Sequence, residues 1–457
     1  MSNQKPSLPK GTRDFGPAQM VRRNYIFDTI RSVFKKFGYQ PLETPSMENL
    51  SVLTGKYGDE GDQLLFKILN TGEFLKKTRA TDYEAGESAM LSKIAEKGLR
   101  YDLTVPFARY VVMNRSDITF PFRRYQIQPV WRADRPQRGR YREFYQCDAD
   151  VVGTDSLICE AEIMQMISEA FGKLGLKDYT VSLNSRKVLT GITEAIGAAG
   201  KEAEFCVAID KLDKIGEEKV MDELRGRGFS EEAIEKARPV LNMDKGNDGR
   251  LAALEKMFAA SEAGRKGLEE IRTIFSLMQA MNVSTERISF DPTLARGLSY
   301  YTGAIWEVKV NNVKMGSVSG GGRYDNLTGV FGMPDMSGVG FSFGVDRIYD
   351  VLEELDLFPL DVLESTRVLF INFDDKSTMA VLPLLTDLRN EGINCEVYPD
   401  AVKLKKQMNY ADKKGIPYVV LAGSEEIASG KYTLKNMTTG EQVQLTPTEI
   451  ISRMKAN

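Results

Sequence analysis

Arginines are concentrated in one segment of this chain. Residues 123–142 contain seven arginines and no lysine, and Asp134 is their single acid, although the whole chain has a formal net charge of -3. Arginine offers a planar, permanently charged fork that binds phosphate oxygens bidentately and stacks on flat rings. The choice of arginine at every basic position therefore indicates phosphate recognition with defined geometry. The alternative is an exposed basic surface that binds anions loosely, and the interleaved aromatic residues argue against it.

The arginine-rich segment also has the pattern of a long β-hairpin. Residues 123–133 and 139–152 are strand-like, and Pro136 and Gly139 favour a turn between them. Upstream, Asp102 and Thr104 are two residues apart, which predicts that they share one face of a strand or extended turn. A helix is expected after Pro106.

A second cluster of interest is the glycine-rich stretch GVGFSFGVDR at 338–347. It lacks the G-x-G-x-x-G spacing of a dinucleotide fold, and no P-loop sequence occurs in the chain. Tight packing of backbone on backbone is one explanation of these glycines. Arg347 at the opening of a helix favours another, because the helix dipole and free N–H groups there attract anions.

Composition excludes several kinds of chemistry. The 457 residues include no histidine, which removes every mechanism built on imidazole. The four cysteines are far apart and form no C-x-x-C pair, as expected of buried thiols in a reducing compartment. The first residues lack the apolar core of a signal peptide, and no run reaches the roughly 18 apolar residues of a membrane span. We expect a cytoplasmic protein without a membrane segment.

These segments together resemble the class II aminoacyl-tRNA synthetases, and among them the histidyl-tRNA synthetases. The helix and strand that end at Pro45 resemble the first class motif, VWRADRPQRGRYREF (130–144) the second and GVGFSFGVDR the third. ARGLSYYTG (295–303) and GGGRYDNL (320–327) are similar to signatures of the histidine enzymes. The resemblance extends from Leu8 into the C-terminal domain and is weakest in 186–280.

The resemblance implies that the chain activates L-histidine with ATP and transfers it from the adenylate to the 3′ end of tRNA(His). The amino-acid carboxylate attacks the α-phosphorus, so cations and positioning supply the catalysis and no protein nucleophile is needed. Mg²⁺ would share the charge on the phosphates, and no residue is assigned as its ligand. The implied catalytic residues are Arg132, Arg296 and Arg347. The implied ATP-binding residues are Arg132, Asp134, Arg140, Phe144 and Arg347.

For histidine, the resemblance places Asp102 at the α-ammonium group and Asp150 and Tyr301 at the imidazole. The full implied set is Asp102, Leu103, Thr104, Arg132, Gln146, Asp150, Arg296, Tyr300, Tyr301 and Tyr324. Two positions depart from the family pattern, because Asp134 stands where class II enzymes often carry Glu and Asp346 precedes the third-motif arginine.

The implied fold is α+β, with an antiparallel class II sheet flanked by helices. We expect catalytic parts at 1–185 and 281–358, a helical insert at 186–280 and an α/β anticodon-binding domain at 366–457. The chain is expected to form a homodimer through the first motif, and 78–98 is expected to be a mobile loop. Basic points in the C-terminal domain, 403–407 and Lys413-Lys414, are either a tRNA contact or a solvated helix face.

Three alternatives remain at this stage. One is a non-catalytic paralogue that senses histidine and regulates histidine biosynthesis, although such chains usually lack the C-terminal domain. Another is a synthetase for threonine, proline or glycine, against which ARGLSYYTG and Asp150 argue. The last is a general nucleic-acid binder, which would not need Asp102, Gln146 and Asp150 beside the arginines.

Overall fold

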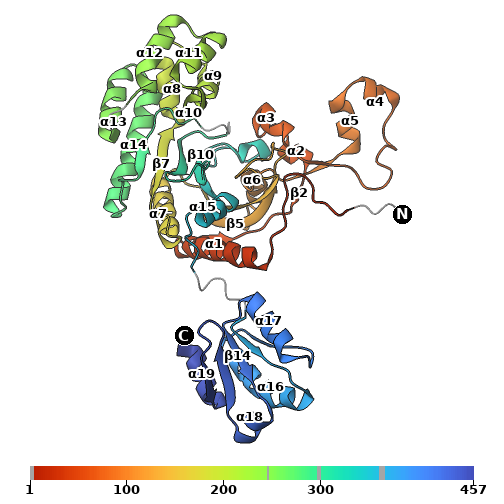
Figure 1. Ribbon diagram of the computed structural model, residues 1–457. Coiled ribbons are helices and arrows are strands. Elements are labelled where there is room, and N and C mark those ends of the chain that lie inside the picture. The colour runs from red at the N-terminus through yellow and green to blue at the C-terminus, as the bar shows by residue number, and fades with distance from the viewer. Residues whose placement is uncertain (1–4, 244–245, 296–299, 360–365, 457) are drawn as a thin grey trace. The chain divides into compact units, whose positions relative to one another are not determined.

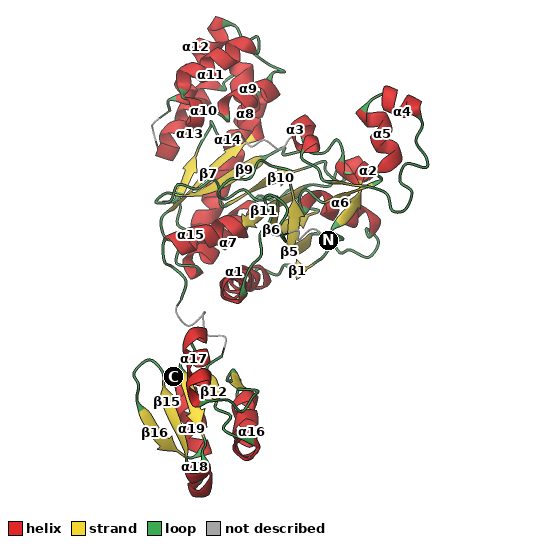
Figure 2. Ribbon diagram, turned by 45° about the vertical axis from the view of Figure 1, so that its right-hand side comes forward, coloured by secondary structure: helices red, strands yellow, loops and turns green. Residues whose placement is uncertain are grey.

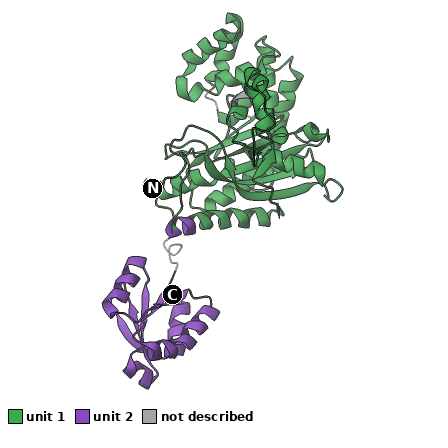
Figure 3. Ribbon diagram, turned by 90° about the vertical axis from the view of Figure 1, so that its right-hand side faces the viewer, with its two compact units in different colours: residues 1–16, 23–358 green, residues 17–22, 359–457 purple. Residues whose placement is uncertain are grey.

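The computed structural model describes residues 5–243, 246–295, 300–359 and 366–456 (Figure 1). These residues form two compact units, one of 1–16 with 23–358 and the other of 17–22 with 359–457 (Figure 3). The larger unit contains the segments that resemble the class motifs. No helix within the described ranges has the length and apolar character needed to cross a membrane.

An eight-stranded sheet forms the centre of the larger unit. Its strand order is β1-β5-β6-β11-β10-β9-β7-β8, and the pairs are antiparallel except β1–β5 and β7–β8. The bounds are β1 Gln40–Pro41, β5 Phe122–Trp131, β6 Glu143–Val152, β7 Tyr179–Ser185, β8 Ile288–Phe290, β9 Ala304–Val310, β10 Ser319–Tyr324 and β11 Gly338–Gly344. The mixed fold with a mainly antiparallel sheet is as predicted, and β5 and β6 form the expected hairpin.

Helices cover the apolar face of this sheet (Figure 2). They are α1 (Pro17–Lys36), α7 (Ile158–Lys173) and α15 (Val345–Glu354). Phe34 of α1 packs its ring 5.6 Å from Tyr125 and 5.9 Å from Phe341, which belong to β5 and β11. Successive residues of a strand alternate between faces, so the residues next to these point to the other side. That side carries the polar residues of β6.

The segment 78–98 differs from its expectation. It contains two short helices, α4 (Ala80–Glu84) and α5 (Glu87–Ile94), and the beginning of strand β4 (Lys97–Leu99). The Asp82 carboxylate accepts a hydrogen bond of 2.8 Å from the N–H of Arg79, the residue that precedes α4. This bond satisfies a backbone donor at the start of the helix. Strand β4 joins β2 (Met47–Asn49) and β3 (Lys67–Ile68) in a small sheet. The expectation of a loop was therefore wrong for α4 and α5, although neither helix has a buried residue.

Helix α6 (Thr104–Met113) also begins earlier than predicted. We expected the helix after Pro106 and an extended backbone at Thr104. Proline is tolerated in the first turn of a helix, where its missing N–H is not needed. The Asp102 Oδ1 accepts the N–H of Val105 at 3.1 Å, so this carboxylate supports the helix start.

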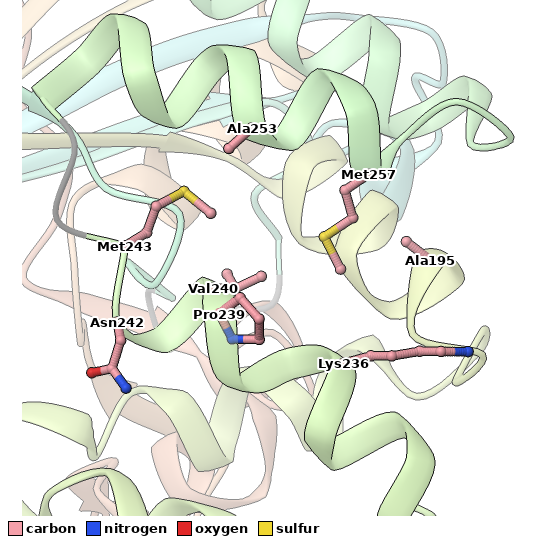
Figure 4. A pocket seen from close by; sticks show the side chains of 8 residues that line it. All are labelled: Ala195, Lys236, Pro239, Val240, Asn242, Met243, Ala253 and Met257. Atoms are coloured by element: carbon pink, nitrogen blue, oxygen red, sulfur yellow. The ribbon is translucent and has the colours of Figure 1, made fainter.

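The region 186–280 is helical. It contains α8 (Arg186–Ala195), α9 (Glu202–Ile209), α10 (Leu212–Ile215), α11 (Glu217–Gly226), α12 (Glu231–Leu241), α13 (Gly246–Met257) and α14 (Glu262–Ala280). Helices α8 and α14 approach closely, because a Cβ on Gly191 would lie 2.4 Å from the Gly264 Cα. A cavity of about 610 Å³ lies between the end of α8, α12 and α13. Figure 4 shows Met243 and Met257 among its lining side chains, which are mostly apolar and include no arginine.

The smaller unit has its own five-stranded sheet, in the order β13-β12-β14-β15-β16. Strands β12 (Val368–Phe370), β13 (Cys395–Val397) and β14 (Tyr418–Leu421) are parallel, and β15 (Tyr432–Asn436) and β16 (Gln442–Leu445) continue antiparallel. Its helices are α16 (Asp375–Asn390), α17 (Leu404–Lys414), α18 (Ser424–Ser429) and α19 (Pro447–Ala456). The first five elements form the βαβαβ order that the sequence pattern predicts.

Candidate active site

A cavity of about 750 Å³ lies over the polar face of the large sheet. Most residues that the family resemblance singles out line it, although they come from segments far apart in the chain. They are Asp102, Thr104, Arg132, Asp134, Arg140, Phe144, Gln146, Asp150, Tyr300, Tyr301, Tyr324 and Arg347. Leu103 is not among the lining residues, since its side chain is fully buried in the core. Arg296 lies outside the described residues.

The register of the central strands explains why one end of the cavity is acidic. In β6, Gln146, Asp148 and Asp150 alternate with the buried Cys147, Ala149 and Val151, so they share the cavity face. Asp150 lies opposite Arg124 of β5 and Gly340 of β11. A Cβ at position 340 would lie 2.0 Å from the Asp150 Oδ1. Glycine is therefore required at this point by a side chain as well as by backbone packing.

Asp150 is held by two neighbours. Its Oδ2 is 2.8 Å from an Arg124 guanidinium nitrogen, and its Oδ1 accepts a 2.7 Å hydrogen bond from the Tyr324 hydroxyl. Burial raises the pKa of Asp150, while the charge of Arg124 and the hydrogen bond from Tyr324 lower it. Arg124 is fully buried, with its guanidinium 4.2 Å from the centre of the Phe107 ring. It therefore supplies the counter-charge that favours an ionised Asp150.

Asp102 is buried at the start of α6. Its Oδ1 accepts hydrogen bonds from the Tyr57 hydroxyl at 3.0 Å and from the Val105 N–H. Among the residues that the structure describes, its Oδ2 has no hydrogen-bond partner. Burial raises the pKa of Asp102, against the charge of Arg132 and the two hydrogen bonds. A buried acceptor without a partner is suited to a cationic donor supplied by a ligand.

Three tyrosines lie beside these carboxylates. The ring centres of Tyr300 and Tyr301 are 4.7 Å apart, and Tyr300 meets Tyr324 edge to face at 6.2 Å. Burial, with the negative charge of Asp102 or Asp150 nearby, raises the pKa of Tyr300 and Tyr324 far above the usual value. These two hydroxyls are therefore neutral and able to donate hydrogen bonds.

Gln146 and Asp148 complete the acidic end. The Gln146 Nε2 donates to the Ser342 hydroxyl at 3.0 Å. The Gln146 Oε1 accepts no hydrogen bond from any residue in the described part of the chain. Burial raises the pKa of Asp148 to about 7, and the neighbouring charges of Asp150 and Asp102 act in the same direction. Arg124 and Ser342 oppose that shift. Asp148 was not among the predicted site residues.

The other end of the cavity is formed by arginines. Arg132 donates from Nε to the Tyr101 carbonyl at 3.1 Å, and its guanidinium lies 4.3 Å from the Tyr101 ring centre and 5.2 Å from that of Phe144. Backbone and rings thus fix the direction of the guanidinium plane. The charge itself is not paired with a carboxylate in any salt bridge of the described residues.

Arg347 is fixed through backbone carbonyls. Its Nε donates to the Gly139 carbonyl at 2.8 Å and one terminal nitrogen donates to the Ser317 carbonyl at 2.5 Å. Gly139 has a positive φ of 70° and packs so closely that a Cβ would lie 2.5 Å from the Met315 Sδ. The hydrogen bond from Arg347 to the Gly139 carbonyl joins the loop between β5 and β6 to helix α15. The loop also carries Arg140, whose half-exposed side chain is 3.6 Å from the Asp134 carboxylate.

Sequence reasoning assigned no role to Arg124, although it lies within the arginine-rich segment. Its partner is set by the register of β5 on β6, which pairs position 124 with 150. Asp346 was noted only as a departure from the family pattern. It is buried and accepts contacts from Arg13 and Arg23, each at 2.6 Å. Alternation of 146, 148 and 150 along a strand was the signal that could have identified Asp148.

In the smaller unit, the basic points of α17 divide into two kinds. Lys405 and Lys406 are exposed, whereas Lys414 is 2.8 Å from Glu396. Gln407 is fully buried and donates from Nε2 to the carbonyls of Asn372 and Val402. The segment 403–407 therefore includes one residue that is structural.

Comparisons with known proteins agree with this arrangement. A family model described as histidyl-tRNA synthetase matches residues 93–348, and one described as an anticodon binding domain matches 367–457. The histidine–tRNA ligase of Cytophaga hutchinsonii is 59% identical over 452 residues, covering 99% of this chain and 100% of the relative. That of Phocaeicola vulgatus is 58% identical, covering 99% of each chain.

Solved structures give the same result. The histidyl-tRNA synthetase of Nostoc sp. PCC 7120 superposes with a TM-score of 0.84 at 31% identity, over 99% of this chain and 100% of the other. A Bacillus halodurans protein described as an ATP phosphoribosyltransferase regulatory subunit/histidyl-tRNA synthetase shares the fold, with a TM-score of 0.71 at 19% identity. The resemblance drawn from the motifs is confirmed, and the chain belongs to the histidyl-tRNA synthetase family.

Proposed function

We propose that this chain is a histidine–tRNA ligase, which forms histidyl-adenylate from L-histidine and ATP and then transfers histidine to the 3′ end of tRNA(His). The observation that supports this function most directly is one cavity with arginines at one end and buried carboxylates at the other. Full-length relatives that are themselves histidine–tRNA ligases favour a catalytic chain over a regulatory paralogue.

ATP binds at the arginine end in this proposal. Arg132 contacts the α-phosphate, and Phe144 and Arg347 enclose the adenine while Arg347 reaches the γ-phosphate. Arg140 contacts the pyrophosphate end, and Asp134 orients it. Negative charge grows on the phosphate oxygens as the histidine carboxylate attacks, so fixed guanidinium groups stabilise the transition state more than the ground state. Arg296 is proposed as a further cation on the α-phosphate and on the substrate carboxylate.

Histidine binds at the acidic end. The α-ammonium group donates to the Asp102 Oδ2 and to the Gln146 Oε1, which have no hydrogen-bond partner among the described residues, and Thr104 lies beside them. Asp150, paired with the Arg124 guanidinium, accepts the imidazole N–H, and Tyr301 contacts the second ring nitrogen. Tyr300 and Tyr324 close the pocket, and Leu103 contributes through its backbone. A pocket that hydrogen-bonds both ring nitrogens rejects analogues lacking them by about 10⁴–10⁵.

The smaller unit binds the anticodon in this proposal. Anticodon bases are single-stranded, so stacking on aromatic side chains and contacts to base edges can recognise them. Tyr410 and Phe373 expose 37% and 38% of their surface, and the exposed Lys405 and Lys406 lie on the helix that carries Tyr410.

Mg²⁺ enters as MgATP, bound by phosphate oxygens. We also propose a homodimer that works in the cytoplasm, where its tRNA is charged.

Amino-acid-dependent ATP–pyrophosphate exchange, measured with each of the twenty amino acids, tests the function. Exchange with histidine alone is the expected result. A regulatory paralogue would bind histidine without exchange, and a sister synthetase would exchange with another amino acid. Either outcome would contradict the proposal.

A further inference from the structure

The N-terminal segment Pro9–Phe15 lies against the loop between β5 and β6, residues 132–142. The Arg142 N–H donates to the Gly11 carbonyl at 2.8 Å. Gly11 has a φ of +87°, and a Cβ there would lie 2.8 Å from the Arg142 Cγ and 2.9 Å from the Pro136 Cγ. The two backbones are therefore in direct contact, at a point where only glycine fits without displacement.

Arg13 adds a second attachment on the same loop. One terminal nitrogen donates to the Tyr141 hydroxyl at 3.0 Å, and the guanidinium lies 3.9 Å from the centre of the Tyr141 ring. The other terminal nitrogen is 2.6 Å from the Asp346 Oδ1. Tyr141 in turn donates to the Asp350 carboxylate at 3.0 Å. Arg13 thus joins the loop to helix α15.

Asp346 connects this attachment to the cavity. It directly precedes Arg347, and its Oδ2 accepts the Tyr145 N–H at 3.0 Å, next to Phe144. It is 4% exposed and also pairs with Arg23, whose side chain is 2% exposed. The pair of Asp346 with Arg23 is buried on both sides and is therefore a low-dielectric contact, unlike a surface ion pair. Arg13 itself is not among the residues that line the cavity.

We propose that the N-terminal segment, through Gly11 and Arg13, is a positioning element that holds the β5–β6 loop in its ATP-binding conformation. The inference rests on the proposed function, since it takes Arg132, Arg140 and Arg347 as contacts of ATP. The loop is anchored at its base, where the Arg132 N–H donates to the Arg142 carbonyl at 3.0 Å. Arg135, Gln137, Arg138 and Arg140 of the loop are exposed, although Gly139 is buried against Arg347. Without the N-terminal segment, the loop would have more conformations to lose when ATP binds.

The first test is kinetic. Arg13→Ala should raise the KM for ATP in pyrophosphate exchange by about tenfold while the KM for histidine changes less than about twofold, because only the loop side of the cavity loses its support. Gly11→Ala should also raise the KM for ATP more than the KM for histidine, and it does so without any change of charge. Lys10→Ala is the matched control, because Lys10 is an exposed cation of the same segment. Its KM values should stay near those of the unmodified chain.

The second test does not depend on activity. Trypsin cleaves after arginine, and Arg138, Arg140 and Arg142 lie in the loop. Under native conditions Arg13→Ala and Gly11→Ala should be cut in this loop several-fold faster than Lys10→Ala, with fragments identified by mass spectrometry. Unchanged cleavage and unchanged KM for ATP, or equal rises in both KM values, would overturn the positioning role. Absence of exchange in the unmodified chain would instead contradict the proposed function, which the cleavage assay does not require.

Discussion

The two ends of the cavity use charge in different ways. At the acidic end, Asp102, Asp148 and Asp150 are 3%, 2% and 2% exposed and are set on a strand or at a helix start. At the arginine end, Arg140 is half-exposed and Arg132 is partly exposed, and both lie on a loop. Guanidinium groups keep their charge in either environment, whereas a carboxylate changes its pKa when buried. Recognition of a small polar side chain such as that of histidine depends on the buried acidic end of the cavity. Phosphate binding is compatible with the more exposed arginine end.

The comparison predicts the largest effect at the buried end. Asp150→Ala should reduce histidine activation by about 10⁴-fold, because it removes the acceptor for a ring N–H and leaves Arg124 buried without its counter-charge. Equilibrium dialysis should show that ATP still binds. Unchanged histidine affinity, or loss of ATP binding in a folded variant, would contradict the division of the cavity into two ends.

Arg132→Ala should lower the rate of adenylate formation by about 10²–10³-fold, the usual loss when one group that stabilises transition-state charge is removed. Pre-steady-state measurement of adenylate isolates this step from product release. Arg135→Ala removes an equal charge from an exposed position of the same loop and is the control. If both variants lost the same factor in the rate of adenylate formation, the effect would come from the overall positive potential of the loop and not from the position of Arg132.

Asp148→Asn tests the cost of buried carboxylates. The pKa of Asp148 in the folded chain is about 7, above its ordinary value near 3.8, so the folded state holds a proton that the unfolded state releases. Its contribution to stability is therefore lost as pH rises from about 4 to 7, by roughly 4 kcal/mol at most. The variant should be more stable than the unmodified chain by about 4 kcal/mol at pH 8 but by only about 1–2 kcal/mol at pH 5, as measured by urea unfolding.

The exposed Asp155 offers a control for that measurement. Asp155→Asn should change stability little, and by the same amount at both pH values. A gain for Asp148→Asn that is equal at pH 5 and pH 8 would mean that the benefit comes from packing or hydrogen bonding and not from charge.

The smallest effect is expected at the most open point of the arginine end. Arg140→Ala should raise the KM for ATP by about two- to fivefold, since an exposed charge contact contributes about 0.2–1 kcal/mol. The catalytic rate should be nearly unchanged in steady-state exchange. A loss as large as that of Arg132→Ala would show that the loop closes over ATP and buries Arg140.

Some features of this protein were predictable because they depend on neighbouring residues. Alternation and turn residues predicted the β5–β6 hairpin, which the strand register confirms. The motifs predicted the family, which is confirmed. Local reasoning was wrong at 78–98 and at the start of α6, where side-chain hydrogen bonds to backbone N–H groups supply helix starts that hydrophobic spacing does not show.

By itself, the sequence determined which chemical groups the protein has: arginines without histidine, a glycine-rich approach to a helix, and carboxylates at alternate positions of a strand. The tertiary structure alone decided which of them meet. Arg124 faces Asp150 because of strand register, and Arg13 reaches Asp346 across 333 positions of the chain. The physical reason is that pairing and burial depend on the packing of distant segments, and burial then sets the pKa and the partners of each charge.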